Sequence, residues 1–271
     1  MKKVLAIFVV ALLSHTAHAQ SEKARVLTRE LANEGVIYSM IASNAYVDDP
    51  MKVRFPLEEL GWNKVDLNGN PVPDGKNSYT PKTLIGKIFS NLQYDIWEDS
   101  RSNKTIIAFK GSEEVFDWIN GNLSIGLSTP YKSAKKHVLK YISKHPKRKV
   151  SVTGHSLGGG IALSVSLWEG VDAVAFNTSP RLFDGMMNAN APAVRLVFFQ
   201  EGEILQKIRK KHLKFLKKIR PDQIVETNFE YPGGTSHRID LLAEGLLACA
   251  TDPDLSNISK LIKNPVPCYL K

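Results

Sequence analysis

Long apolar runs, internal repeats and cysteines are all scarce in this chain of 271 residues. The apolar run over residues 4–13 is shorter than the roughly 18 to 20 residues that a membrane-spanning helix needs, and no later stretch qualifies either. No repeat, low-complexity tract or linker interrupts the remaining sequence, which argues against a string of separate domains. Because Cys249 and Cys268 are the only cysteines, at most one disulfide can form.

The first residues carry the pattern of an export signal. The basic start Met1-Lys2-Lys3 precedes the apolar run, and Ala17-His18-Ala19 supplies a small-x-small cleavage pattern. We therefore expect residues 1–19 to be a cleaved signal peptide and residues 20–271 to form a single catalytic domain, periplasmic or secreted. An uncleaved N-terminal anchor is the alternative. An oxidising compartment would permit a Cys249–Cys268 disulfide tying the tail to the preceding helix, and two free thiols are the alternative there.

Positive charge dominates, with 36 Lys and Arg against 27 Asp and Glu and a formal net charge of +9. This balance favours anionic partners, and for an exported protein a phospholipid surface fits better than nucleic acid. Eight Lys or Arg lie within residues 203–220, with apolar residues at helical spacing. Such a cationic amphipathic helix suits peripheral contact with anionic membranes, although an ordinary surface helix has the same pattern. The sequence gives no indication of oligomeric state.

Strands and helices are predicted to alternate along most of the chain. The predicted helices span residues 21–46, 131–144, 158–169 and 236–250, and the predicted strands span 92–98, 105–109, 149–153, 171–176 and 193–200. Residues 50–90, rich in Pro, Gly and Asn, receive no assignment. The alternation predicts an α/β fold with a mainly parallel sheet covered by helices on both faces.

A G-x-S-x-G motif lies where a predicted strand meets a predicted helix. Gly154-His155-Ser156-Leu157-Gly158 follows the strand over residues 149–153 and opens a helix rich in small residues. In this context the motif is typical of a nucleophile elbow, whose tight turn requires the two glycines and exposes the serine at the sheet edge. The motif therefore predicts Ser156 as a nucleophile, with the Leu157 N–H at the helix start available to an oxyanion.

Three segments resemble the class 3 lipases, the α/β-hydrolase family of filamentous-fungal triacylglycerol lipases. They are the elbow extended to Gly159, the strand Ile106–Ser112 followed by Asp117-Trp118, and the turn over residues 177–181. The resemblance covers about residues 90–240 and implies an α/β-hydrolase fold, a lipid-ester substrate and an oxyanion hole formed by Ser112 and Leu157. Two departures mark a distant member: Lys110 replaces the usual Arg, and Asn177-Thr178 replaces an aromatic-glycine pair.

The general base should follow the nucleophile in the chain order Ser, acid, His. This order leaves His212 and His237, and neighbouring lysines disfavour His212 as a base, so we predict His237. The acid should follow the strand over residues 193–200, which leaves Glu201, Glu203 and Asp222 open. The turn Glu203-Ile204-Leu205 resembles the place of the aspartate in class 3 lipases, so the resemblance favours Glu203.

These residues predict acyl transfer to water through an acyl-enzyme on Ser156, with Glu203 and His237 completing the triad and Ser112 and Leu157 the oxyanion hole. The reaction needs no metal or organic cofactor. The expected activity is that of a lipase or esterase. One alternative is a phospholipase acting on anionic membranes as a secreted effector, and another is an inactive lipase-like protein that binds lipid or a partner.

Overall fold

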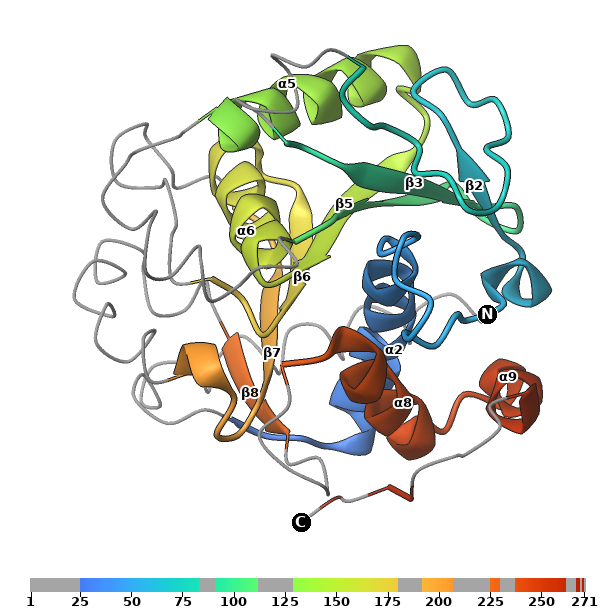
Figure 1. Ribbon diagram of the computed structural model, residues 1–271, viewed down its shortest axis with the longest axis vertical. Helices are drawn as coiled ribbons and strands as arrows, with labels where there is room; N and C mark the ends of the chain where they lie inside the picture. Colours follow the sequence, from blue (N-terminus) through green and yellow to red (C-terminus); the bar gives the residue numbers. More distant parts are fainter. Residues whose placement is uncertain are drawn as a thin grey trace, which may run out of the picture.

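A computed structural model of the protein describes residues 25–82, 91–111, 129–179, 192–206, 225–229, 237–261, 267–268 and 270. Its centre is an eight-stranded sheet in the order β1-β8-β7-β6-β5-β4-β3-β2 (Figure 1). The strands are β1 (Arg25–Val26), β2 (Trp62–Val65), β3 (Tyr94–Asp99), β4 (Lys104–Phe109), β5 (Lys149–His155), β6 (Asp172–Phe176), β7 (Arg195–Gln200) and β8 (Val225–Phe229). The helices are α2 (Arg29–Asn44), α5 (Thr129–Lys144), α6 (Leu157–Glu169), α8 (Ile239–Cys249) and α9 (Ser256–Leu261), with 3-10 turns η2 (Leu57–Leu60) and η4 (Pro253–Leu255).

The sheet is parallel from β4 to the β1 edge and antiparallel only where β2 and β3 join it. This arrangement confirms the prediction of a mainly parallel α/β sheet. Since parallel strands end at the same edge, the segments that follow β4, β5 and β7 meet there. These segments contain Gly111, Ser156 and Glu203.

Two apolar layers cover the sheet, as alternation along its strands requires. Ile106 and Ala108 of β4 pack on the face covered by α2 and α8, whereas Ile107 and Phe109 pack on the face covered by α5 and α6. Figure 1 shows the two helix pairs on opposite sides of the sheet. Both faces are therefore buried, which explains the nearly continuous apolar sequence of the central strands.

The start of the first helix and three of the strands, β1, β2 and β8, differ from the sequence prediction. Helix α2 begins at Arg29 and not at residue 21, because Thr28 caps it by accepting a hydrogen bond from the Leu31 N–H at 3.3 Å. Within the predicted helix, Arg25–Val26 instead forms β1 beside β8. Neither β8 nor β2 was predicted, since the polar composition of both strands obscures the apolar pattern on which strand prediction depends.

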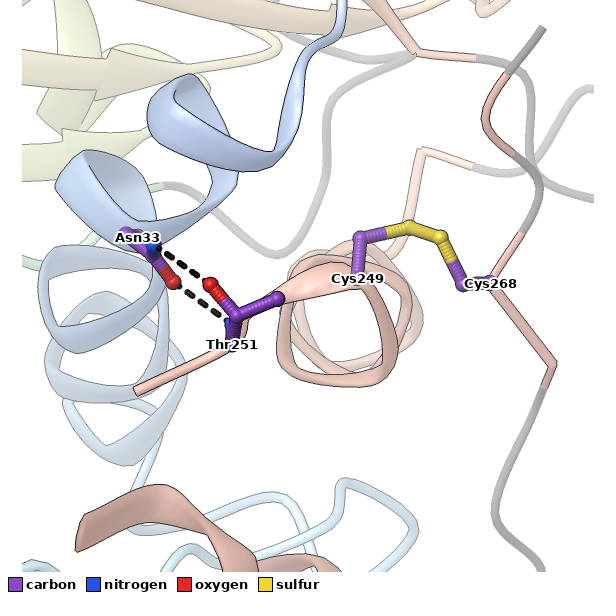
Figure 2. Close-up of a disulfide and its surroundings, with 4 residues drawn as sticks. All are labelled: Asn33, Cys249, Thr251 and Cys268. Carbon is purple, nitrogen blue, oxygen red and sulfur yellow. Dashed lines mark hydrogen bonds between the residues drawn. A yellow bond between two sulfur atoms is a disulfide. The ribbon is translucent and has the colours of Figure 1, made fainter. Parts of the chain in front are cut away.

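The C-terminal part of the chain is fastened to the core in two places (Figure 2). Cys249, the last residue of α8, forms a disulfide with Cys268, which confirms the predicted bridge. Asn33 of α2 donates to the Thr251 hydroxyl at 3.1 Å and accepts from the Thr251 N–H at 2.8 Å. The chain leaving α8 is thus bonded to the neighbouring helix as well as cross-linked to the tail.

Candidate active site

Ser156 occupies the sharp turn between β5 and α6. Its backbone has φ 57° and ψ −123°, a conformation that a non-glycine residue adopts at a cost of about 1–3 kcal/mol. Two glycines make the turn feasible: a Cβ on Gly154 would lie 2.4 Å from the Gly158 carbonyl, and one on Gly158 would lie 2.0 Å from the Phe109 carbonyl oxygen. The turn is therefore the strained elbow that the motif predicts.

Backbone hydrogen bonds fix the elbow to the neighbouring strand. The Ser156 N–H donates to the Phe176 carbonyl at 3.1 Å, and the Ser156 carbonyl accepts from the Ser179 N–H at 2.9 Å. Leu157 is the first residue of α6, where N–H groups have no acceptor within the helix and the helix dipole is positive. An oxyanion beside Ser156 would meet this end of the helix.

His237 and Glu203 form a hydrogen-bonded pair close to the elbow. The His237 Nδ1 atom lies 2.8 Å from Glu203 Oε2, and the Glu203 side chain is fully buried. With its proton on Nδ1, the neutral imidazole leaves Nε2 as an acceptor. Among the described residues Nε2 is buried without a hydrogen-bond partner, as a general base awaiting a serine or substrate proton would be.

The turn after β7 orients Glu203. Its N–H donates to the Gln200 carbonyl at 3.1 Å, and its Oε2 also accepts from the Leu205 N–H at 2.9 Å. Asn177, with φ 41°, accepts the Gln200 N–H on its side-chain oxygen at 2.9 Å and so fixes the end of β7. The turn that departs from the class 3 lipase pattern therefore has a defined structural role. Glu201, the rival acid, is exposed.

His155 links the elbow to the loop of His237. Its Nε2 lies 2.7 Å from the His237 carbonyl oxygen, and the two imidazole rings have centroids 4.6 Å apart. Its Nδ1 lies 2.8 Å from the Tyr46 hydroxyl. Because both ring nitrogens are engaged, His155 is not available as a base, and the structure brings His237 next to the residue that precedes Ser156.

The strand end that leads to Ser112 also reaches the elbow. A Cβ on Gly111 would lie 3.2 Å from the Ser156 Cβ. Ser112 itself lies outside the described residues, as do the proposed alternatives His212 and Asp222 and residues 207–220 of the basic segment. The part of Ser112 in an oxyanion hole therefore stays a prediction, which the position of its neighbour Gly111 supports.

Tyr46 and Asn177 are the site residues that sequence reasoning missed. In the sequence, Asn177 stands out only as a departure from the class 3 lipase pattern. Tyr46 follows α2 and is far from the motif in sequence, so nothing in a single chain connects it to Ser156. Over the part of the chain that the structure describes, no group of three or more His, Cys, Asp or Glu side chains is arranged to hold a metal ion.

The fold, a mainly parallel sheet covered by helices on both faces with the elbow directly after β5, is that of an α/β-hydrolase. Residues 38–214 match the family model "Phospholipase-like", described as the Tle-like phospholipase domain, and the chain belongs to this family.

Other similar proteins include fungal lipases. A lipase of Rhizomucor miehei is 28% identical over 165 residues, which cover 53% of this chain and 41% of that protein. The chain thus matches about two fifths of that relative's length. Similar solved structures include lipase II of Rhizopus niveus, with 16% identity, a TM-score of 0.48 and 79% and 86% of the two chains covered. The Rhizomucor miehei lipase propeptide complex has 18% identity, a TM-score of 0.46 and 68% and 66% coverage.

Proposed function

We propose that the protein is a serine-dependent hydrolase of carboxylic esters in lipids. The observation that carries this proposal is the His237–Glu203 pair beside a strained serine elbow, with an unpartnered imidazole nitrogen in the described structure. The membership of the chain in a phospholipase-like family and its similarity to a Rhizomucor lipase support a lipid ester as substrate.

In the proposed reaction the Ser156 oxygen attacks the ester carbonyl carbon while its proton passes to His237 Nε2. Glu203 holds the Nδ1 proton and stabilises the imidazolium that forms. The Leu157 N–H and Ser112 stabilise the negative oxygen, and the imidazolium then protonates the departing alcohol. Water attacks the resulting acyl-enzyme by the same steps, which releases the fatty acid and restores Ser156.

Labelling with a fluorophosphonate tests this proposal. The wild-type protein should be labelled at Ser156 and should hydrolyse a short soluble ester, whereas Ser156→Ala and His237→Ala should lose about 10⁴ or more in kcat, as triad deletions do. A protein that is folded but neither labelled nor active would instead be an inactive, lipid-binding relative.

Phospholipids are the second candidate substrate, and the family match favours them over simple glycerides. The net charge of +9 also favours approach to anionic lipid surfaces. Release of fatty acid should be compared between glycerides, zwitterionic phospholipids and anionic phospholipids under identical conditions. Preference for phospholipid would identify a phospholipase, whereas preference for triglyceride would identify a lipase.

We also propose that the protein is exported and acts at membranes as a peripheral enzyme. No described helix has the length and apolarity to cross a bilayer. Replacing Lys210, Lys211, Lys214 and Lys217 with Gln should weaken binding to anionic vesicles and reduce its salt dependence, since each surface cation contributes about 1 kcal/mol. Hydrolysis of a soluble ester should not change. N-terminal sequencing of the exported protein tests cleavage before Gln20.

A further inference from the structure

Tyr46 and His155 form a buried hydrogen-bond chain that joins two parts of the active site. The Gly111 N–H donates to the Tyr46 hydroxyl oxygen at 3.2 Å, and this hydroxyl lies 2.8 Å from His155 Nδ1. The other ring nitrogen of His155 lies 2.7 Å from the His237 carbonyl oxygen. Tyr46 and His155 are each only 4% exposed. This hydrogen-bond chain therefore runs from Gly111, at the strand end before Ser112, to the backbone of His237, the predicted base.

The groups at its two ends, an N–H donor on Gly111 and a carbonyl acceptor on His237, determine the direction of the bonds between them. A carbonyl oxygen can only accept a hydrogen bond. His155 Nε2 therefore carries a proton and donates a hydrogen bond to the His237 carbonyl oxygen. In the neutral imidazole Nδ1 is then an acceptor, to which the Tyr46 hydroxyl donates while its oxygen receives the Gly111 N–H. Each group thus has one arrangement in which all three bonds form together.

The ring of Tyr46 is itself held in place by two lysines. Lys52 Nζ lies 3.9 Å from the ring centroid and Lys110 Nζ lies 5.8 Å from it. Lys52 pairs with Asp49 at 2.8 Å and Lys110 pairs with Asp48 at 2.9 Å. Cations over an aromatic face attract it, so these contacts fix the ring and its hydroxyl. Lys110, which departs from the class 3 lipase pattern, thus contacts the ring of Tyr46.

Gly111 packs closely against both Tyr46 and the elbow. A Cβ on Gly111 would lie 2.5 Å from both the Tyr46 hydroxyl and the His155 carbonyl oxygen. The strand end, the elbow and Tyr46 are therefore in mutual contact at one point, and the His237 loop is attached to them through His155.

We propose that Tyr46 and His155 are positioning residues, which set the His237 backbone and the strand end before Ser112 at a fixed distance from Ser156. This inference rests on the proposed hydrolase function. Neither residue carries the reacting proton. Their contribution is alignment, and a misplacement of about 1 Å at a reacting group lowers rates by about a hundredfold.

The test measures kcat and KM for a short soluble ester, together with labelling by a fluorophosphonate, in Tyr46→Phe and His155→Leu. We expect kcat to fall by about five- to tenfold in Tyr46→Phe, which removes the hydroxyl and both of its hydrogen bonds, and by up to about a hundredfold in His155→Leu. KM should stay within about twofold, since both side chains are buried. His155→Gln should recover part of the loss, because its amide can donate to the His237 carbonyl oxygen.

Tyr38→Phe is the matched control. Tyr38 lies on α2, and its hydroxyl donates to Ser151 Oγ at 3.2 Å, in β5 but away from the elbow. Tyr38→Phe removes one partly buried tyrosine hydroxyl, so the thermal midpoint should fall by a few degrees, similarly to Tyr46→Phe. Because this hydroxyl lies away from the elbow, kcat should stay within about twofold of wild type.

The double variant Tyr46→Phe/His155→Leu should lose less kcat than the product of the two single losses, because both changes break the shared Tyr46–His155 hydrogen bond. Additive losses, unchanged kcat in folded Tyr46→Phe, or equal losses in Tyr38→Phe would overturn the inference while leaving the hydrolase proposal intact. A folded wild-type protein that is neither labelled nor active would overturn both.

Discussion

Replacing Glu203 with glutamine removes the charge beside His237 and keeps the size of the side chain. Glu203 Oε2 accepts from both the His237 imidazole and the Leu205 N–H, and the side chain is fully buried. Water therefore cannot take the place of the lost carboxylate. A glutamine oxygen can accept both bonds only if its NH₂ group points away, and the opposite rotamer would present a donor to Nδ1 and favour the wrong tautomer of His237.

The expected loss follows from these two arrangements. If the amide oxygen faces His237, the charge-assisted hydrogen bond becomes a neutral one and the imidazolium loses its stabilisation, a loss of at least about tenfold in kcat. If the NH₂ group faces it, the base holds its proton on the wrong nitrogen, and the same acid-to-amide change in a serine triad lowers kcat by about 10⁴. We expect Glu203→Gln to lose between about 10 and 10⁴ in kcat with little change in KM.

Glu201→Gln is the matched control, since it alters an exposed carboxylate in the same turn. Steady-state kinetics on a soluble ester and the rate of fluorophosphonate labelling should be measured for both variants, with circular dichroism to confirm folding. Glu201→Gln should stay within about twofold of wild type, as exposed substitutions usually do. A larger loss in Glu201→Gln than in Glu203→Gln would refute the assignment of the acid.

Three further predictions concern stability. Replacing Cys249 and Cys268 with Ser should lower the free energy of unfolding by about 3 kcal/mol in denaturant titrations, since the bridge closes a loop with a sequence separation of 19; an unchanged midpoint would contradict this. Burial, and secondarily Asp240, raise the pKa of Glu244 to about 6 from 4.5, so the folded state loses stability as pH rises through this window. Glu244→Gln should therefore stabilise the protein by up to about 2 kcal/mol at pH 7.5 and have no effect at pH 4, and the same gain at both values would rule out the ionisation. Gly158→Ala should destabilise the fold by several kcal/mol, because the added Cβ would lie 2.0 Å from the Phe109 carbonyl oxygen; a soluble variant with the wild-type thermal midpoint would show that the elbow can relax.

The sequence by itself determined the class of fold and the position of the elbow. Apolar strands alternating with amphipathic helices leave few arrangements other than a parallel sheet covered on both faces, and the structure has that arrangement. The elbow was predictable because its constraints are local: two glycines next to each other in space are also close in sequence, at Gly154 and Gly158. Chain order then reduced seven histidines to two candidates for the base.

Only the tertiary structure decided which side chains meet at the sheet edge. Glu201 and Glu203 lie in one turn and have the same chemistry, and they differ because the turn buries one of them against His237 and leaves the other exposed. Tyr46 reaches His155 across a separation of 109 residues, through a contact that depends on how α2 packs on the sheet. Local patterns record the constraints between neighbours along the chain, whereas these contacts arise from packing between distant segments, which no single stretch of sequence encodes.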